Sequence, residues 1–169
     1  TKYSLPILEN GVKLPDFKIE DKYKLKYNLP QNVSDYDFLL SLCEEGLNKK
    51  VGRNHSKFKD YEKRTKDELQ VFKELGFCSY ILITWDIVNY CGENNIPTGR
   101  GRGSCVASLV LNLIDVTQDD PIEAGLFFER FISKTRAKKN IVDGIVYIDG
   151  SLLPDIDLDE SFRDRRKVI

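Results

Sequence analysis

The chain has 169 residues, of which 41% are hydrophobic and 31% are charged, and its formal net charge is −1. This length suits one domain with a buried core, and the charge excludes a globally basic nucleic-acid-binding protein, so any DNA contact has to be local. No apolar run reaches the ~18 residues needed to span a bilayer, and no signal-peptide pattern opens the chain, which favours a soluble intracellular protein.

The first elements contrast a proline-containing arm with an amphipathic helix. Residues 1–33 carry three prolines among mixed charges and are predicted to form an irregular connector arm. A helix is predicted to begin at Ser34, because Ser34 and Asp37 have capping-box spacing, with Asp in place of Glu. One apolar stripe of this helix consists of Phe38, Leu39, Leu42, Cys43 and Leu47. We expect residues 34–169 to form the domain and this helix to be part of its core.

Two further helices are predicted downstream. Residues 61–75 place apolar side chains on one face, and Gly76 follows as a left-handed cap. Residues 79–94 form the next helix, in which Trp85 is interpreted as a core anchor behind the following loop rather than as a base-stacking platform. The polar stretch 48–64 is interpreted as a solvated face, with nucleic-acid contact as the alternative.

A glycine-rich loop precedes a short apolar helix. It occupies residues 96–104, contains Arg100 and Arg102, and is followed by a helix predicted over 105–111. Glycines allow close approach of the backbone to a ligand, and a helix N-terminus with arginines nearby favours a phosphate. The loop fits neither the P-loop nor the dinucleotide fingerprint, and by itself a flexible turn explains it equally well.

The next segment is predicted to form a helix and then a hairpin. Asp120 is expected to cap a helix that begins at Pro121 and turns Leu126, Phe127 and Phe131 inward. Arg130 then points elsewhere, either to a ligand or to a salt-bridge partner. The basic stretch 134–139 fits a phosphate contact and a solvated loop equally. Apolar runs at 141–142, 145–148 and 152–153, around Asp149-Gly150, predict a hairpin that leads into an acidic strand.

That acidic strand places carboxylates at alternate positions. Asp155, Asp157 and Asp159 would share one face of an extended strand, while Ile156 and Leu158 bury the other. Carboxylates this close repel one another unless a multivalent cation lies between them, which predicts half of a two-metal site. A calcium loop is disfavoured because its required glycine and glutamate are absent at the sixth and twelfth positions.

The cysteines and the single histidine suggest no metal site. None of the four cysteines has Cys-x-x-Cys spacing, and most lie in apolar runs, so they are interpreted as reduced core residues. His55 has no evident partner and receives no role, and a zinc site is not expected.

Four motifs occur in a fixed order along the chain. They are Glu74-Leu75-Gly76-Phe77-Cys78-Ser79-Tyr80-Ile81-Leu82-Ile83-Thr84-Trp85-Asp86, Gly101-Arg102-Gly103-Ser104, Phe128-Glu129-Arg130-Phe131 and Pro154-Asp155-Ile156-Asp157. This order resembles the C-family bacterial replicative polymerases, specifically the palm of the DNA polymerase III alpha subunit, over about residues 60–169. The resemblance implies an α/β fold of the α+β type, an incomplete polymerase beta-like nucleotidyltransferase palm with a mixed sheet and flanking helices.

The resemblance also implies a set of site residues. Asp155 and Asp157 match the two first catalytic aspartates and would hold two Mg²⁺ ions, whereas Asp159 matches an acid with no direct catalytic role. Gly103 and Ser104 match a pair that contacts the incoming triphosphate. Two basic positions near the phosphates correspond to Arg102 and Arg130.

The reaction that the resemblance implies is template-directed transfer of a deoxynucleotide from dNTP to a primer 3′-hydroxyl. Expected partners are primer–template DNA, dNTP, the remainder of the polymerase or a complementing split subunit, and a replisome clamp bound through other regions, with no membrane. The resemblance also implies a cytoplasmic, nucleoid-associated location in a bacterial cell, with the gene belonging to the bacterium or to a phage. Because the family's third catalytic aspartate, PHP domain, thumb and fingers have no counterpart here, we expect a first palm segment that is inactive alone.

Two alternatives stay open at this stage. One is another nucleotidyltransferase that acts on RNA or a small molecule, which would need no template. The other is a non-catalytic DNA-binding or scaffold piece of a split polymerase.

Overall fold

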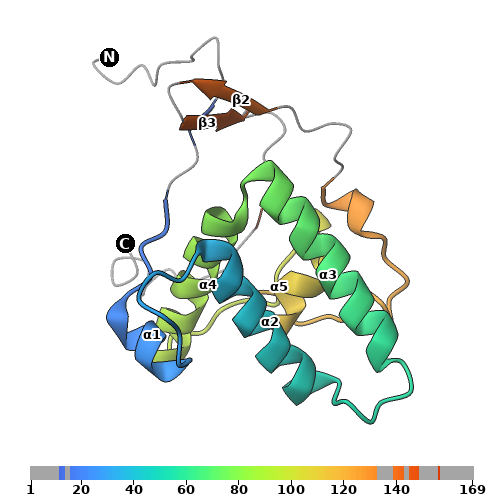
Figure 1. The fold of residues 1–169 in the computed structure, drawn as a ribbon. Helices are drawn as coiled ribbons and strands as arrows, with labels where there is room; N and C mark the ends of the chain where they lie inside the picture. The colour runs from blue at the N-terminus through green and yellow to red at the C-terminus, as the bar shows by residue number, and fades with distance from the viewer. Residues whose placement is uncertain (1–11, 14–15, 133–138, 143–144, 149–155, 157–169) are drawn as a thin grey trace.

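The computed structural model describes residues 12–13, 16–132, 139–142, 145–148 and 156. Its main body is helical (Figure 1). In chain order the elements are β1 (Val12–Lys13), α1 (Asp21–Lys26), α2 (Asp35–Lys50), α3 (Phe58–Leu75), α4 (Cys78–Glu93), the 3₁₀ helix η1 (Gly103–Ala107), α5 (Leu109–Leu113), the 3₁₀ helix η2 (Phe128–Arg130), β2 (Lys139–Val142) and β3 (Ile145–Ile148).

The predicted α/β fold with a mixed sheet is wrong for the part of the chain that the structure describes. The strands form one small sheet in the order β1-β3-β2, and both pairings are antiparallel. The sheet lies above the helices in Figure 1. The core is instead made by helices and the loops between them, whose apolar faces pack on one another. Strands of two to four residues are too short to form the centre of a layered domain.

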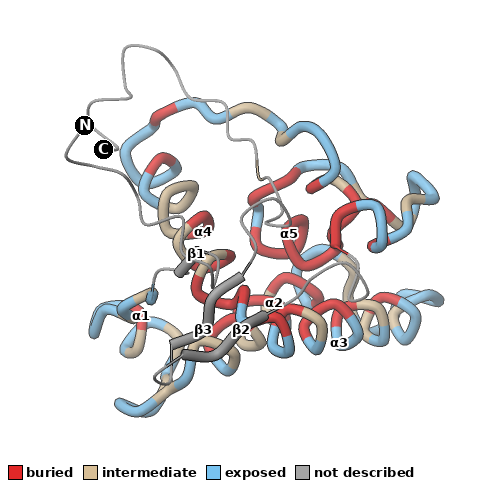
Figure 2. Tube along the Cα trace, turned by 90° about the horizontal axis from the view of Figure 1, so that it is seen from above, coloured by how far each residue is buried: buried red, intermediate tan, exposed pale blue. Residues whose placement is uncertain are grey.

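Helix α2 begins and packs as its sequence predicts. Ser34 has extended backbone dihedrals, and its Oγ accepts a hydrogen bond from the Asp37 backbone N–H at 3.1 Å. This cap satisfies one of the N–H groups that have no partner within the helix. The predicted apolar stripe is buried, and Figure 2 shows the buried positions along α2 in red. On the same face, a Cβ at Gly46 would collide with the Leu113 carbonyl, so glycine allows α5 to approach closely.

Helices α3 and α4 confirm the predicted helix pair. Gly76 ends α3 with φ 73°, the left-handed conformation that glycine adopts without a Cβ penalty. Leu69 and Phe72 are fully buried on α3. Trp85 on α4 is a core anchor as predicted, since it is 6% exposed and its ring meets the rings of Tyr23 at 4.9 Å and Phe38 at 5.4 Å, edge to face.

Part of the predicted irregular arm belongs to the packed body. Residues 21–26 form α1, and Tyr23 is 3% exposed in the main core. The Tyr23 hydroxyl donates to Asp86 Oδ1 at 2.6 Å, and its ring stacks on Phe38 at 6.1 Å. The prediction of an unpacked arm is therefore wrong for this segment. The segment packs on the core despite its many charged residues, because the Tyr23 ring buries apolar area while its hydroxyl forms a hydrogen bond.

This burial predicts an alkaline stability change that depends on Tyr23. Desolvation first, and the hydrogen bond to Asp86 second, raise the pKa of Tyr23 from 10.0 to about 12. The neutral hydroxyl therefore contributes stability fully below pH 10, and this contribution is lost as the pH rises through 12. We expect thermal melting of Tyr23→Phe to depend less on pH over this window than that of the wild type. The control is Tyr90→Phe, at an exposed position of α4; equal slopes for Tyr23→Phe and wild type would contradict the prediction.

Downstream of α5, the predicted helix after Asp120 is only a turn. Asp120 does cap it, since Oδ1 accepts from the Ile122 N–H at 2.8 Å, but the chain leaves the helical path after residue 125. Gly125 has φ 68°, a conformation that interrupts a helix. As a result Phe127 is 73% exposed rather than buried, while Phe131 is buried as predicted.

The remaining predictions on the fold concern the hairpin, the cysteines and membranes. The predicted apolar runs at 141–142 and 145–148 lie in β2 and β3, which pair in the register Val142↔Ile145. The predicted turn at Asp149-Gly150 lies outside the described residues, so a hairpin at that turn stays a prediction. All four cysteines are buried thiols, as predicted. Among the helices that the structure describes, none combines the length and apolar character needed to cross a membrane.

Candidate functional site

The predicted site residues fall into two groups. Arg102, Gly103, Ser104 and Arg130 are described, and all four are exposed. Asp155 and Asp157, with their neighbour Asp159, lie outside the described residues. Within the described residues no group of three or more His, Cys, Asp or Glu side chains could hold a metal ion, so the predicted two-metal site stays a prediction.

The loop before η1 is held against the segment that follows α5. The Gln118 N–H donates to the Arg100 carbonyl at 3.1 Å. Gly101 has φ 83°, and a Cβ there would lie 3.0 Å from Thr117 Cγ2. Gly103 has φ 77° and begins η1. Glycine is therefore required for the backbone path on either side of Arg102, and this path leaves the Arg102 and Ser104 positions exposed.

The predicted helix over residues 105–111 is divided into two elements. η1 ends at Ala107, Ser108 has extended dihedrals, and α5 starts at Leu109. The expected free N–H groups at the helix start are not available to a ligand at α5. They are bound by a carboxylate of the protein itself, because Glu68 Oε2 accepts from the Leu109 N–H at 3.0 Å and Oε1 from the Val110 N–H at 3.2 Å. The start of α5 therefore offers none of its first three N–H groups to a phosphate.

Glu68 is one of the most deeply buried side chains in the molecule, although it can carry a charge. It is 1% exposed, and its Oε1 also accepts from Ser108 Oγ at 2.7 Å. Burial raises the pKa of Glu68, and its hydrogen bonds with Ser108, the two backbone N–H groups and Arg64 oppose that rise. This buried carboxylate caps the first two N–H groups of α5, beside the N-cap residue Ser108, whose Oγ accepts from the Leu111 N–H at 3.3 Å.

Arg64, one turn before Glu68 on α3, connects the two short helices of the site. Its Nε donates to Glu68 Oε2 at 3.0 Å, its Nη2 to the Ala107 carbonyl at 2.7 Å and its Nη1 to the Leu126 carbonyl at 2.9 Å. Ala107 is the last residue of η1, and Leu126 lies two residues before η2. One planar guanidinium therefore holds the segments that carry Arg102 and Arg130, and η1 and η2 also contact each other.

Two further residues of α3 support the same arrangement. Phe72 meets the ring of Phe128 at 5.5 Å and that of Phe131 at 6.4 Å, both edge to face, which packs η2 against the helix. Tyr61 donates to Asp120 Oδ2 at 2.5 Å and so contacts the turn that precedes η2. Helix α3 thus organises the loops on both sides of the site.

Sequence reasoning missed Arg64 and Glu68. Residues 48–64 were interpreted as a solvated face, and only the apolar residues of α3 were placed inward. The signal was present in the spacing, because Glu68 stands four residues before Phe72 and so falls on the buried stripe. A charged residue on an apolar stripe requires partners, and here they come from loops that follow much later in the chain.

The described end of the chain gives one observation on the acidic motif. Ile156, the residue between Asp155 and Asp157, is partly buried and packs against the core. The alternation with the acids predicts that Ile156 is buried on one face of a strand. Its partial burial agrees with this prediction, but Ile156 itself is not assigned to a strand.

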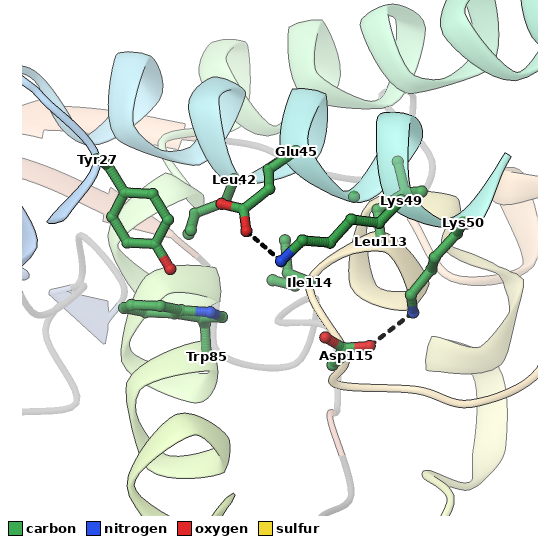
Figure 3. A pocket seen from close by; sticks show the side chains of 10 residues that line it. Tyr27, Leu42, Glu45, Lys49, Lys50, Trp85, Leu113, Ile114 and Asp115 are labelled. Atoms are coloured by element: carbon green, nitrogen blue, oxygen red, sulfur yellow. Dashed lines mark hydrogen bonds and ion pairs between the residues drawn. The ribbon is translucent and has the colours of Figure 1, made fainter. Parts of the chain in front are cut away.

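The pockets lie apart from these residues. One cavity of ≈ 70 Å³ has Tyr27 and Trp85 on its wall, and the ion pair of Lys50 with Asp115, at 2.7 Å, lies beside it (Figure 3). A wider pocket of ≈ 530 Å³ shares Trp85 and Asp115 with it. Neither pocket is lined by a predicted site residue.

Comparison with known proteins identifies the family. The family model described as the bacterial DNA polymerase III alpha NTPase domain matches residues 37–169. The chain is 37% identical over 145 residues to the DNA polymerase III subunit alpha of Aquifex aeolicus, which covers 85% of this chain and 11% of that protein. It is 36% identical over 138 residues to the protein of the same name from Bacillus subtilis, covering 82% and 11%. For the Mycoplasma genitalium protein the identity is 38% over 137 residues, covering 80% and 14%.

The chain therefore spans little more than a tenth of the length of these curated relatives. The matched region includes nearly all of α2, the elements from α3 to β3 with both short helices of the site, and the Asp155-Ile156-Asp157 motif. On this match, the chain belongs to the family of the bacterial DNA polymerase III alpha NTPase domain.

Proposed function

We propose that this chain is the segment of a replicative DNA polymerase that holds the triphosphate of the incoming dNTP, within the catalytic palm of the complete enzyme. The observation that carries the proposal is the placement of two exposed arginine positions in a member of the polymerase III alpha family. Arg102 lies immediately before η1 and Arg130 at the end of η2, and these two short helices contact each other. Fixed positive charges on neighbouring loops suit a polyanionic ligand.

Four residues are proposed to contact the triphosphate. Arg102 and Arg130 pair with phosphate oxygens, Gly103 lets the backbone approach them, and the Ser104 hydroxyl donates a hydrogen bond. The ligand is thereby held in line for attack by the primer 3′-hydroxyl on its α-phosphorus, and pyrophosphate leaves. Positioning of this kind supplies much of the acceleration in phosphoryl transfer.

Asp155 and Asp157 are proposed to hold two magnesium ions. Carboxylate oxygens are ligands that Mg²⁺ prefers, and the packing of Ile156 against the core is what ties this motif to the helical body. Bound metal would lower the pKa of the attacking hydroxyl and neutralise charge on the departing pyrophosphate. A third aspartate would come from the remainder of the polymerase, so the isolated segment is proposed to be inactive.

The partners of the proposed enzyme follow from the reaction. They are primer–template DNA, dNTP, the remainder of the polymerase polypeptide or a complementing subunit, and a clamp bound outside this segment. With a formal net charge of −1, this segment would contact DNA only locally.

Template-directed primer extension by the complete polymerase tests the proposal. We expect Arg130→Ala to raise the KM for dNTP by about tenfold, because one charge-assisted contact to phosphate is lost, while the dissociation constant for primer–template DNA stays unchanged.

Arg53→Ala, at an exposed arginine between α2 and α3, is the matched control. An unchanged KM in Arg130→Ala would contradict a triphosphate contact at this position. Extension that needs no template would favour a different nucleotidyltransferase.

A further inference from the structure

The buried carboxylate of Glu68 and the partly buried guanidinium of Arg64, which is 21% exposed, form an ion pair that contacts no predicted ligand. Instead, the pair is surrounded by backbone groups of the two segments that carry the site. The backbone N–H at the start of α5 donates to Glu68, and the carbonyls of Ala107 and Leu126 accept from Arg64. Burying the Glu68 carboxylate costs desolvation energy, so we looked for a role of this pair beyond stability.

The geometry of Arg64 indicates such a role. Three different donor nitrogens of one rigid, planar group reach three acceptors on three segments, at 2.7 to 3.0 Å. The separation between the Ala107 and Leu126 carbonyls is thereby set by the shape of the guanidinium. A lysine ammonium is a point charge that could pair with Glu68 but could not fix both carbonyls.

The fixed carbonyls of Ala107 and Leu126 determine where Arg102 and Arg130, the two arginines proposed to bind the triphosphate, lie. Arg102 precedes η1, whose last residue is Ala107, and Arg130 closes η2, which begins two residues after Leu126. Each segment is short, so a shift of its anchored end moves the arginine with it. Misplacement by about 1 Å can reduce a rate by on the order of 100-fold.

We propose that Arg64, oriented by Glu68, is a positioning residue that sets the distance between the Arg102 and Arg130 segments and thereby the fit of the triphosphate. This inference rests on the proposed function, since it assigns a consequence for nucleotide binding to a pair that touches no nucleotide. This role distinguishes Arg64 from a purely structural ion-pair residue, whose replacement would change stability alone.

The test uses steady-state primer extension by the complete polymerase carrying Arg64→Lys, which keeps the charge paired with Glu68 and is expected to fold. We expect the KM for dNTP to rise about tenfold, with a smaller decrease in kcat and an unchanged dissociation constant for primer–template DNA. Arg64→Ala is the less informative variant, because it leaves Glu68 buried without its charged partner.

The matched control is an exposed pair on the same helix, one residue earlier. Lys63 and Asp67 have the same i,i+4 spacing, lie 3.0 Å apart, and are 80% and 66% exposed. Lys63→Met should leave the KM for dNTP and kcat unchanged. A change in Lys63→Met as large as that in Arg64→Lys would overturn the inference, because the KM for dNTP would then respond to any side-chain change on this part of α3 and not to Arg64 specifically.

A double-mutant cycle separates positioning from a second, independent contact. If Arg64 acts by positioning Arg102, Arg64→Lys should raise the KM for dNTP by a smaller factor in the Arg102→Ala background than in the wild-type background. Full additivity, or parallel losses in KM, kcat and DNA affinity, would overturn the positioning role.

Failure of the proposed function has a different signature from failure of this inference. If Arg102→Ala and Arg130→Ala both leave the KM for dNTP unchanged, the triphosphate site itself is wrong. If those two variants raise KM and Arg64→Lys does not, only the positioning role of Arg64 is wrong.

Discussion

Replacing Asp155 and Asp157 together with Asn is expected to reduce primer extension by the complete polymerase by at least about 1000-fold. Asn keeps the shape of each side chain but removes the charge that binds Mg²⁺. Metal ions supply several kcal/mol of transition-state stabilisation, and about 4 kcal/mol corresponds to about 1000-fold in rate. Folding should be preserved because the variant retains Ile156, which packs against the core.

The measurement is template-directed extension across a magnesium titration, with binding of primer–template DNA as the check on folding. Asp159→Asn is the matched control, since it makes the same change two positions later in the same motif. If the double variant retains extension, the catalytic assignment of the motif is wrong and the segment is a scaffold. An equal loss in Asp159→Asn would point to a general effect of acidic charge instead of two specific ligands.

The second large effect is expected from Glu68→Gln, which should lower the free energy of unfolding by about 3–5 kcal/mol. Each carboxylate oxygen of Glu68 accepts one backbone N–H and one side-chain donor. A glutamine has one acceptor oxygen, so its NH₂ group must face either the Leu109 N–H or the Val110 N–H in any orientation. The variant therefore places two donors against each other in the core and leaves the Arg64 charge without its partner.

Urea unfolding of the chain, followed by fluorescence of its single tryptophan, measures this loss. Trp85 is a suitable probe because it is buried in the same core. Asp67→Asn, on the exposed face of α3, removes a neighbouring carboxylate and should change stability by less than about 0.5 kcal/mol. A Glu68→Gln variant as stable as Asp67→Asn would mean that the carboxylate is not the cap of α5.

The helices that could be predicted from the sequence are those whose ends and faces are encoded locally. Ser34 caps α2 through the N–H of a residue three positions away, and Gly76 ends α3 because its own backbone adopts a positive φ. The buried face of α2 follows from 3.6-residue periodicity, which needs no knowledge of what packs against it.

The loops around the site could not be predicted in the same way. Residues 105–111 have the composition of one helix, but the chain breaks at Ser108 because Glu68, 40 residues earlier, binds the hydroxyl and the first N–H groups of α5. Residues 120–131 begin with a good helix cap, but the path of the chain changes at Gly125, and Arg64, 62 residues away, holds the Leu126 carbonyl. The mixed sheet came from the resemblance alone and did not agree with the helical core.

By itself, the sequence determined the family, the helices with local caps, the buried cysteines and the candidate residues of the site, because each is a property of neighbouring residues or of an ordered set of motifs. Only the tertiary structure decided that α1 joins the core through Tyr23 and that Arg64 and Glu68 link α3 to the loops of the site. The physical reason is that a buried charge must find its partners wherever the fold brings donors and acceptors together, and no local pattern specifies that place.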